Sequence, residues 1–305
     1  MAQNAHAMSL IVERSSVTVD NPSSIVSFET KGGGNWKIWD RYLCVDGKPA
    51  YHIGNICDTC EFFFVRQEGA SQKVSPQKAS SDLRIGLQRL DAELTQRIAS
   101  ILPSGKYRVS LLQCTPELTA PGTETDYFSH EQVELWGIGA HGRLTGQEGD
   151  YWKPHNPQTE YYRLGTRFLG ENLRVRKKPF QMIKKRPRKV ICSQLFEFCI
   201  PISPKNRLNK ETVESYRERF LAGECPTALA ISVMDIKGPA TWEGNPKINQ
   251  HWCLAHYLLD GHHKIYAAAS VHKPLTVLSF IDVSRDFIGL SRRKDVEYLL
   301  DALSR

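Results

Sequence analysis

The sequence predicts a mixed α/β protein, and three observations in its C-terminal third carry that prediction. Apolar runs at Val190–Ile202 and Thr227–Ile236 have strand character, and the polar stretch Lys210–Ala222 between them has helical character. A third apolar run stops abruptly at residue 260, before an alanine-rich helical segment. Strands that alternate with helices favour a sheet that is covered by helices.

Length and changes in composition divide the chain into four parts. With 305 residues it has room for two domains of ordinary size, each with its own core. We expect an N-terminal arm over residues 1–34, an α+β domain over 35–172, a basic linker or strand over 173–189 and a C-terminal α/β domain over 190–305. The arm ends in consecutive glycines, which interrupt regular structure.

Short strand-like runs occupy much of the N-terminal part. Ser9–Val19 is a predicted strand within the arm, and Trp36–Phe64 is predicted to form strands joined by turns. The Asp46-Gly47 pair lies between two apolar runs, which is the sequence signal of a tight β-hairpin. Lys106–Cys114 is a further predicted strand.

A single amphipathic helix is predicted over residues 80–102. Leucine and isoleucine recur there at spacings of three and four, a Ser-Asp pair can cap the start, and Pro-Ser-Gly at 103–105 can stop the end. The glycine- and aromatic-rich stretch from Ala120 to Gly170 has no clear periodicity, so we assign no element to it.

The most specific chemical signal is the sequence Asp260-Gly261-His262-His263-Lys264, which follows a strand-like run and opens a helical one. Glycine adopts backbone angles that are closed to other residues, and the unpaired N–H groups and dipole of a helix N-terminus attract anions. The two histidines and the lysine add donors at the same point. Asp260 can instead hold the turn by accepting its amides. This box predicts a binding site for phosphate or a nucleotide.

The box resembles the phosphate-binding box of the ParB/sulfiredoxin superfamily, which includes partition-protein nucleotide-binding domains, sulfiredoxins and free-serine kinases. The order of strands and helices over residues 188 to 285 is also similar, with a closing strand at Lys273–Ile281. The resemblance implies ATP or ADP with magnesium, held by backbone amides and Lys264. It also implies a kinase that transfers phosphate to a small hydroxylated molecule, or a nucleotide hydrolase, in which His262 or His263 stabilises developing charge.

Departures from the family pattern limit which members of the superfamily this chain can resemble in function. Sulfiredoxins carry a cysteine where this chain has His262, and only about two dozen residues follow Ile281, too few for the helix-turn-helix of partition proteins. The serine kinases place a catalytic glutamate in the loop after the first strand, whereas Ser203–Asn209 contains no carboxylate. Glu197 on the preceding strand, or Glu211 at the helix start, would then serve as the base, and we expect Glu197 in that role.

A non-catalytic function is the alternative: a nucleotide-sensing or nucleic-acid-associated binding protein, which the missing loop glutamate favours. The net charge of +7 comes from one segment, because nine cations and no acid lie between Leu173 and Val190. Such a run is commonly a solvated linker. It also suits a surface within residues 174–189 that contacts the phosphates of RNA or DNA.

A second constellation is His52 followed by Cys57 and Cys60, which has the ligand types and spacing of half a structural zinc site. The fourth ligand would come from elsewhere in the chain, with Cys44, Cys114 or His130 as candidates. A redox pair would have to open a helix, but strand-like residues follow it. The third interpretation is that these are small buried thiols of the core.

The composition is that of a soluble globular protein, 41% apolar and 24% charged. No run approaches the roughly 20 apolar residues that cross a bilayer, and the first residues lack a secretory signal pattern. Eight dispersed cysteines do not form a disulfide scaffold. We therefore expect a cytoplasmic protein whose partners are a nucleotide and a small-molecule substrate, with no membrane contact.

Overall fold

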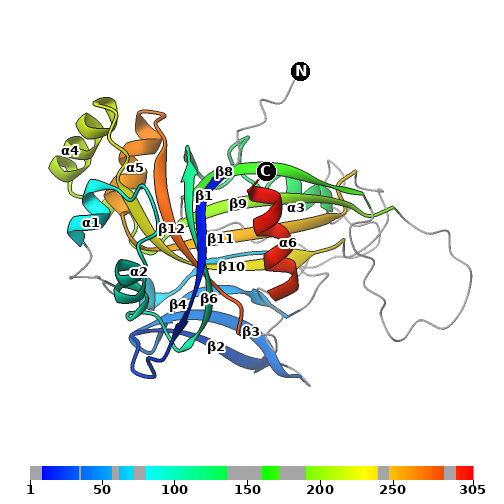
Figure 1. Cartoon of the computed structure of the whole chain (residues 1–305). Coiled ribbons are helices and arrows are strands. Elements are labelled where there is room, and N and C mark those ends of the chain that lie inside the picture. Colours follow the sequence, from blue (N-terminus) through cyan, green and yellow to red (C-terminus); the bar gives the residue numbers. More distant parts are fainter. Residues whose placement is uncertain are drawn as a thin grey trace, which may run out of the picture.

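The computed structural model describes residues 9–33, 36–56, 62–71, 74, 80–135, 160–171, 190–239, 247–284 and 293–304. Two β-sheets form its framework, and helices flank the larger sheet (Figure 1). The architecture is mixed α/β, as the sequence predicts. No helix within these ranges is both long and apolar enough to span a membrane.

The larger sheet has eight strands, which come from both halves of the chain. In spatial order they are β1 (Leu10–Val19), β6 (Gly105–Cys114), β12 (Leu275–Asp282), β10 (Thr227–Lys237), β11 (Gln250–Asp260), β9 (Cys192–Pro201), β8 (Tyr161–Glu171) and β7 (Glu117–Thr119). β10 and β12 are parallel, as are β11 and β9, and the other neighbours are antiparallel. The carboxyl ends of β9 and β11 therefore lie together at one end of the sheet.

The sheet continues across the predicted domain boundary at residue 190. That position falls between β8 and β9, which are hydrogen-bonded neighbours. The predicted arm supplies β1, which pairs with β6 along its whole length. Among the described strands, β9 to β12 do not form a sheet of their own. Open strand edges carry unpaired N–H and C=O groups, and here segments distant in sequence complete the sheet.

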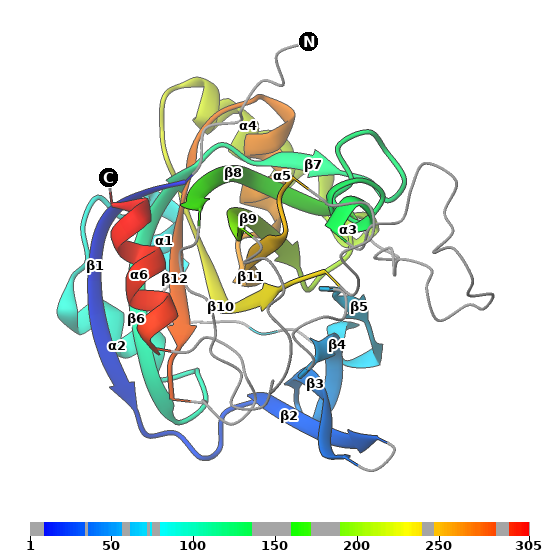
Figure 2. The ribbon, with the colours of Figure 1, turned by 90° about the vertical axis from the view of Figure 1, so that its right-hand side faces the viewer.

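The larger sheet curls, so that β1 at one edge and β8 near the other turn toward the same side (Figure 2). Helix α6 (Arg293–Leu303) lies between them. Arg14 of β1 bonds Asp301 at 2.6 Å, and Arg167 of β8 donates to the carbonyl oxygen of Ala302. The buried face of α6 packs on apolar side chains of β9 to β12. The helix thus connects the two sides of the curled sheet.

The smaller sheet has the order β2 (Val26–Gly33), β3 (Trp36–Val45), β4 (Lys48–Asn55) and β5 (Val65–Arg66). The predicted hairpin is confirmed, because β3 and β4 pair antiparallel with Asp46 and Gly47 at φ angles of 51° and 69°. A two-residue turn of this kind needs positive φ at both positions, which favours Asp-Gly. The main apolar core lies between the two sheets, where Phe62 stacks on Phe198 with ring centroids 5.8 Å apart.

The prediction of a single helix over residues 80–102 is wrong. The structure has two short helices there, α1 (Ser80–Ile85) and α2 (Ala92–Ala99). Gly86 follows α1 at a φ of 106°, and a Cβ atom there would lie 2.2 Å from the carbonyl oxygen of Cys225. Asp91 then caps α2 with its side chain. A close approach to a residue distant in sequence therefore interrupts the periodic pattern.

Two further helices cover the sheet on the face away from the main core. They are α4 (Lys210–Leu221) and α5 (His262–Ser270), while α3 (Glu131–Leu135) and the 3-10 turns Glu68–Ser71 and Lys205–Arg207 are short. Apolar residues of α4 and α5 form one cluster with side chains of β6, β9, β10 and β12. The predicted strands and helix over 190–202, 210–222, 227–236 and 273–281 are confirmed within two residues at each end.

Candidate functional site

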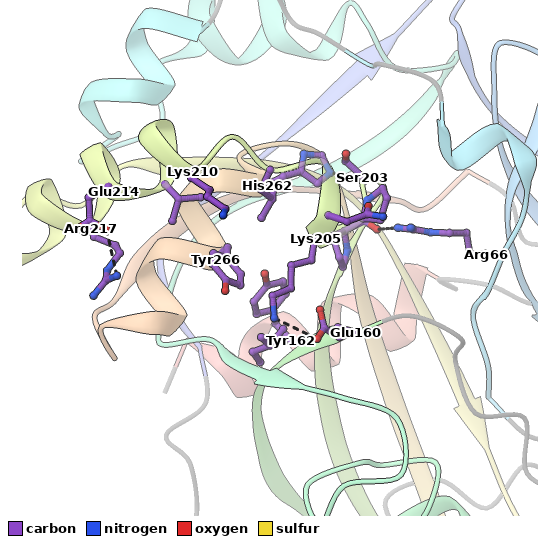
Figure 3. Close-up of a pocket in the computed structure, with 16 residues that line it drawn as sticks. Arg66, Glu160, Tyr162, Ser203, Lys205, Lys210, Glu214, Arg217, His262 and Tyr266 are labelled. Atoms are coloured by element: carbon purple, nitrogen blue, oxygen red, sulfur yellow. Dashed lines mark hydrogen bonds and ion pairs between the residues drawn. The ribbon is translucent and has the colours of Figure 1, made fainter.

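A cavity of about 780 Å³ lies where the carboxyl ends of β9 and β11 meet helix α4. Its described lining comes from the ends of β9 and β8, the loop after β9, α4 and α5, and from Arg66 of β5 (Figure 3). This volume is in the range of small-molecule sites in proteins. Tyr162, Leu118, Val213 and Tyr266 supply apolar and aromatic surface beside the charged groups.

Cations outnumber carboxylates in this cavity. Its described lining has a net charge of +2, from Arg66, Lys205, Lys210 and Arg217 against Glu160 and Glu214. Lys210 is exposed and has no hydrogen-bond or ion-pair partner among the described residues. As the first residue of α4 it also meets the positive end of the helix dipole. A bound anion would neutralise this charge and interact favourably with the start of α4.

The guanidinium of Arg66 has a structural task. It donates to the carbonyl oxygens of Pro201 and Ile202 at 3.0 and 2.9 Å, and to the hydroxyl of Tyr51 at 3.2 Å. These bonds tie β5 of the smaller sheet to the end of β9. The charge of Arg66 still contributes to the potential of the cavity, because the residue is part of its wall.

The remaining two cations are held loosely by carboxylates. Arg217 contacts Glu214 at 3.2 Å through Nη1, while its buried Nε has no partner among the described residues. Lys205 Nζ lies 3.4 Å from Glu160 Oε1 and 5.3 Å from the centroid of the Tyr266 ring. Figure 3 shows Lys205, Glu160, Tyr162 and Tyr266 gathered in the middle of the cavity. Both ion pairs leave donor capacity for a ligand.

The turn at Gly261 has the predicted strand, turn and helix order. Gly261 adopts φ 97° and ψ 19°, a left-handed conformation, and α5 begins at the next residue without a capping side chain in the described structure. A Cβ atom at this position would lie 2.7 Å from the Cβ of Ala228 on β10. The glycine is therefore required by its backbone angles and by packing of the turn against β10.

The two histidines of the box fasten the loop after β9 to α5. His262 Nε2 accepts the N–H of Ser203 at 3.1 Å, and His263 Nε2 accepts the N–H of Asn209 at 3.0 Å. Burial lowers the pKa of His262 to about 4, although the nearby Asp260 acts in the opposite direction. Burial likewise lowers the pKa of His263. Both rings are neutral at pH 7 and carry their proton on Nδ1, so His262 presents no positive charge to the cavity.

Lys264 is placed differently from the sequence expectation. Its side chain is buried, and Nζ donates to the carbonyl oxygen of Thr227 at 2.8 Å and to Asp260 Oδ2 at 3.1 Å. It is not part of the cavity wall. Lys264 and Asp260 thus join the ends of β10 and β11, and the donors of the ammonium group are directed to Thr227 and Asp260. The sequence alone does not distinguish a lysine that contacts a phosphate from a lysine that bonds the strand ends beside its helix.

Glu197 also lies outside the cavity. Its carboxylate is fully buried, accepts from Ser9 Oγ at 2.5 and 2.6 Å, and lies 3.0 Å from His256 Nε2. The contacts continue from His256 Nδ1 to Ser232 Oγ at 2.7 Å and on to Ser279 Oγ at 2.8 Å. The expected role of Glu197 as a base for an acceptor in the cavity does not fit this position, because the carboxylate is enclosed by Ser9 and His256 and does not line the cavity. Glu211 is exposed on α4 and does not line the cavity either.

Only part of the predicted zinc site falls on described residues. His52 Nε2 lies 3.0 Å from Asp40 Oδ1, and its ring stacks on Tyr42 with centroids 4.7 Å apart. Cys57 and Cys60 lie outside the described residues, as does the basic segment 174–189.

The candidates for a fourth zinc ligand lie in ordinary surroundings. Cys44 and Cys114 are buried, and burial raises the pKa of each thiol, that of Cys44 to about 12 with a further contribution from Glu29. His130 is exposed. Within the described ranges, no group of three or more histidine, cysteine, aspartate or glutamate side chains is arranged to hold a metal ion.

Sequence reasoning missed the charged residues of α4. Lys210, Glu214 and Arg217 recur at intervals of four and three residues, which places them on one face of the helix. That spacing was a usable signal. It becomes meaningful only when the face is known to border a cavity together with Lys205 and Glu160, which come from other elements.

In comparisons with known proteins, no family model, no curated protein and no solved structure matches this chain. The similarity of the Asp260–Lys264 box to the ParB/sulfiredoxin superfamily therefore stays a prediction.

Proposed function

We propose that this protein binds a nucleotide or a similar phosphorylated small molecule in the cavity between α4, α5 and the loop after β9. In this proposal the phosphates contact Lys210, Lys205 and Arg217, and the aromatic base packs beside Tyr266 and Tyr162. The single observation that carries the proposal is the net positive charge of the described cavity lining, with Lys210 at the start of α4 unpartnered among the described residues.

The chemistry of the lining favours phosphate over a carboxylate ligand. Three flexible cations come from the loop and from α4, so they suit a group with several acceptor oxygens and more than one negative charge. The tyrosines and the apolar side chains of Leu118 and Val213 suit an aromatic ring on the same ligand. A nucleotide combines these two features.

Catalysis is a narrower proposal than binding. A kinase or nucleotide hydrolase would need a carboxylate near the acceptor, and Glu160 and Glu214 are the carboxylates in the described wall, each held by a cation. Magnesium, which commonly binds phosphates together with one or two carboxylates, would also have to use these two residues. We therefore assign nucleotide binding, with phosphoryl transfer as an activity to be measured.

The test measures the thermal stability of the wild type with ATP, ADP, CTP and GTP, each with and without magnesium. A ligand at about one hundred times its Kd adds roughly 2.7 kcal/mol of stability. We expect stabilisation by at least one nucleotide, weakened in Lys210→Met. Lys48→Met removes an equal charge from an exposed ion pair outside the cavity and serves as the control. Absence of stabilisation by all four nucleotides would contradict the proposal.

Activity is measured on the same samples by release of inorganic phosphate and by transfer to added hydroxylated metabolites. Turnover that disappears in Glu160→Gln but persists in Glu214→Gln would assign an enzyme and name its carboxylate. Stabilisation without turnover would leave a nucleotide-sensing protein.

The nine cations between Leu173 and Val190 favour a second candidate, contact with nucleic acid through residues 174–189. Such binding weakens steeply as salt rises, because phosphate contacts release counterions. Binding of a labelled single-stranded RNA between 50 and 200 mM salt, about the range over which such contacts are lost, separates this candidate from the cavity. Insensitivity of any RNA binding to salt would count against it.

A further inference from the structure

The ion pair between Lys205 and Glu160 is the feature of the cavity that carries a further inference. It is the longest of the ion pairs described, with 3.4 Å between Nζ and Oε1, and the two side chains are 47% and 34% exposed. The exposed pairs Arg219–Glu224 and Lys48–Glu68 are closer, at 2.6 and 2.8 Å. A loose and partly solvated pair of this kind contributes little stability and can exchange partners at low cost.

The backbone on both sides of this pair is held in place. His262 and His263 accept N–H groups at the two ends of the loop that contains Lys205. Glu160 directly precedes β8, whose first residues pair with β7 and β9. An exchange of partners at Lys205 therefore requires only side-chain rotation about its flexible stem, without movement of the main chain.

Lys205 has a second contact that favours such an exchange. Its Nζ lies 5.3 Å from the centroid of the Tyr266 ring, and this cation–π contact can persist while the carboxylate is replaced. Figure 3 shows Glu160 and Tyr266 on two sides of the lysine, within the cavity. Among the described cations of the wall, Lys205 is the one whose charge is neutralised by a carboxylate from another element.

We infer that Glu160 occupies, in the ligand-free protein, the position on Lys205 that a phosphate group of the ligand takes. The inference rests on the proposed function and adds its regulation: Glu160 sets the affinity by competing for Lys205, and binding exchanges one anion for another. Anions with more charge and more acceptor oxygens than a carboxylate, such as polyphosphates, displace it; a single carboxylate does not.

A double-mutant cycle separates this exchange from simple repulsion. Glu160→Gln, Lys205→Met and the double variant are titrated by calorimetry with inorganic pyrophosphate and with the nucleotide that best stabilises the wild type. If Glu160 acts through Lys205, Glu160→Gln raises affinity about fivefold, as expected for one partly exposed ion pair, and has almost no effect in the Lys205→Met background. Glu68→Gln removes an equal charge from the exposed Lys48 pair outside the cavity and should leave the affinity unchanged.

Two outcomes would overturn the inference. An equal gain from Glu160→Gln in both backgrounds would mean that Glu160 acts by long-range repulsion alone, and a loss of affinity would mean that it contacts the ligand. Titration with pyrophosphate distinguishes a failure of the exchange at Lys205 from a failure of the proposed nucleotide binding. If Glu160→Gln raises the affinity for pyrophosphate only when Lys205 is present, and no nucleotide binds, the exchange stands and the nucleotide assignment fails. If nucleotides bind the wild type and the effects of Glu160→Gln and Lys205→Met on binding free energy add, the nucleotide assignment stands and the exchange fails. No binding of either probe to any variant overturns both.

Discussion

Two regions of this protein are rich in polar and charged side chains and have opposite properties. A buried polar row runs across the larger sheet, consisting of Ser9, Glu197, His256, Ser232 and Ser279, and every member is fully buried. The cavity under α4 contains the loose and partly exposed ion pairs Lys205–Glu160 and Arg217–Glu214. The row has the composition expected of a catalytic site, but it is the cavity that a ligand can reach.

The difference lies in how completely each region satisfies its own polar groups. In the buried polar row the Glu197 carboxylate accepts from Ser9 and faces His256, and strand neighbours close the row above and below with apolar side chains. Its interactions act in a medium of low dielectric constant and stabilise the fold. In the cavity, Lys210 has no partner among the described residues, so it is available for a ligand.

The largest effect is expected when one member of the buried polar row is removed. His256→Leu leaves the fully buried Glu197 carboxylate without its contact to His256, which costs about 3–5 kcal/mol in unfolding free energy. Urea denaturation measures this loss. Glu224→Gln, in an exposed pair with Arg219, should change stability by only about 0.5 kcal/mol.

A double variant distinguishes the loss of the Glu197 contact from a general loss of packing. Replacing both partners, as Glu197→Met with His256→Leu, should recover part of the loss, because no carboxylate then remains buried without a hydrogen-bond partner. Folded protein of either kind should bind pyrophosphate as the wild type does. A wild-type unfolding curve for His256→Leu would contradict the structural role of the row.

The second-largest loss of stability is expected at acidic pH. Burial lowers the pKa of His262 from 6.5 to about 4, so the unfolded chain binds the proton more readily than the folded one. This contribution to stability is complete above about pH 6.5 and is lost as the pH falls through 6.5 toward 4, by roughly 3 kcal/mol. Protonation at Nε2 also removes the acceptor of the Ser203 N–H.

The measurement is urea denaturation between pH 7.5 and 4 for the wild type and His262→Gln. The amide can still accept the Ser203 N–H but does not titrate, so the variant should lose less stability over this range. His251, whose pKa burial lowers to about 3, contributes equally to both proteins and cancels in the difference. Identical pH profiles for the two proteins would count against a buried neutral His262.

Lys264→Met tests whether the lysine of the box is structural. Loss of its bonds to Thr227 and Asp260 leaves a buried carbonyl oxygen without its partner and costs about 1–3 kcal/mol. Ligand affinity should stay within about twofold of the wild type, because Nζ is not in the cavity wall. A large loss of affinity with unchanged stability would return Lys264 to the phosphate site.

The smallest effect on stability is expected for Lys210→Met. The side chain is exposed and its charge opposes the helix dipole, so the unfolding free energy should change by at most about 0.5 kcal/mol, in the stabilising direction. Thermal unfolding of the ligand-free protein measures this. Destabilisation beyond about 1 kcal/mol would mean that Lys210 has a structural role and would weaken its assignment as a ligand contact.

The sequence predicted most local elements of the C-terminal third because their signals are local. The Gly261 turn, the start of α4 and the Asp46-Gly47 hairpin all depend on backbone preferences that neighbours in sequence determine. The prediction of one helix over residues 80–102 was wrong because a distant contact decides the structure there: Gly86 packs closely against Cys225, far away in the chain.

Side-chain roles divide in the same way. The sequence by itself determined the mixed α/β class, the strand, turn and helix at residue 261 and the excess of positive charge, because composition and short-range geometry set them. Only the tertiary structure decided that Lys264 and Glu197 are buried, that His262 is a neutral acceptor, and that Lys210, Lys205 and Glu160 meet in a cavity. Burial and the choice of partner depend on segments that are distant in sequence, and no local pattern contains that information.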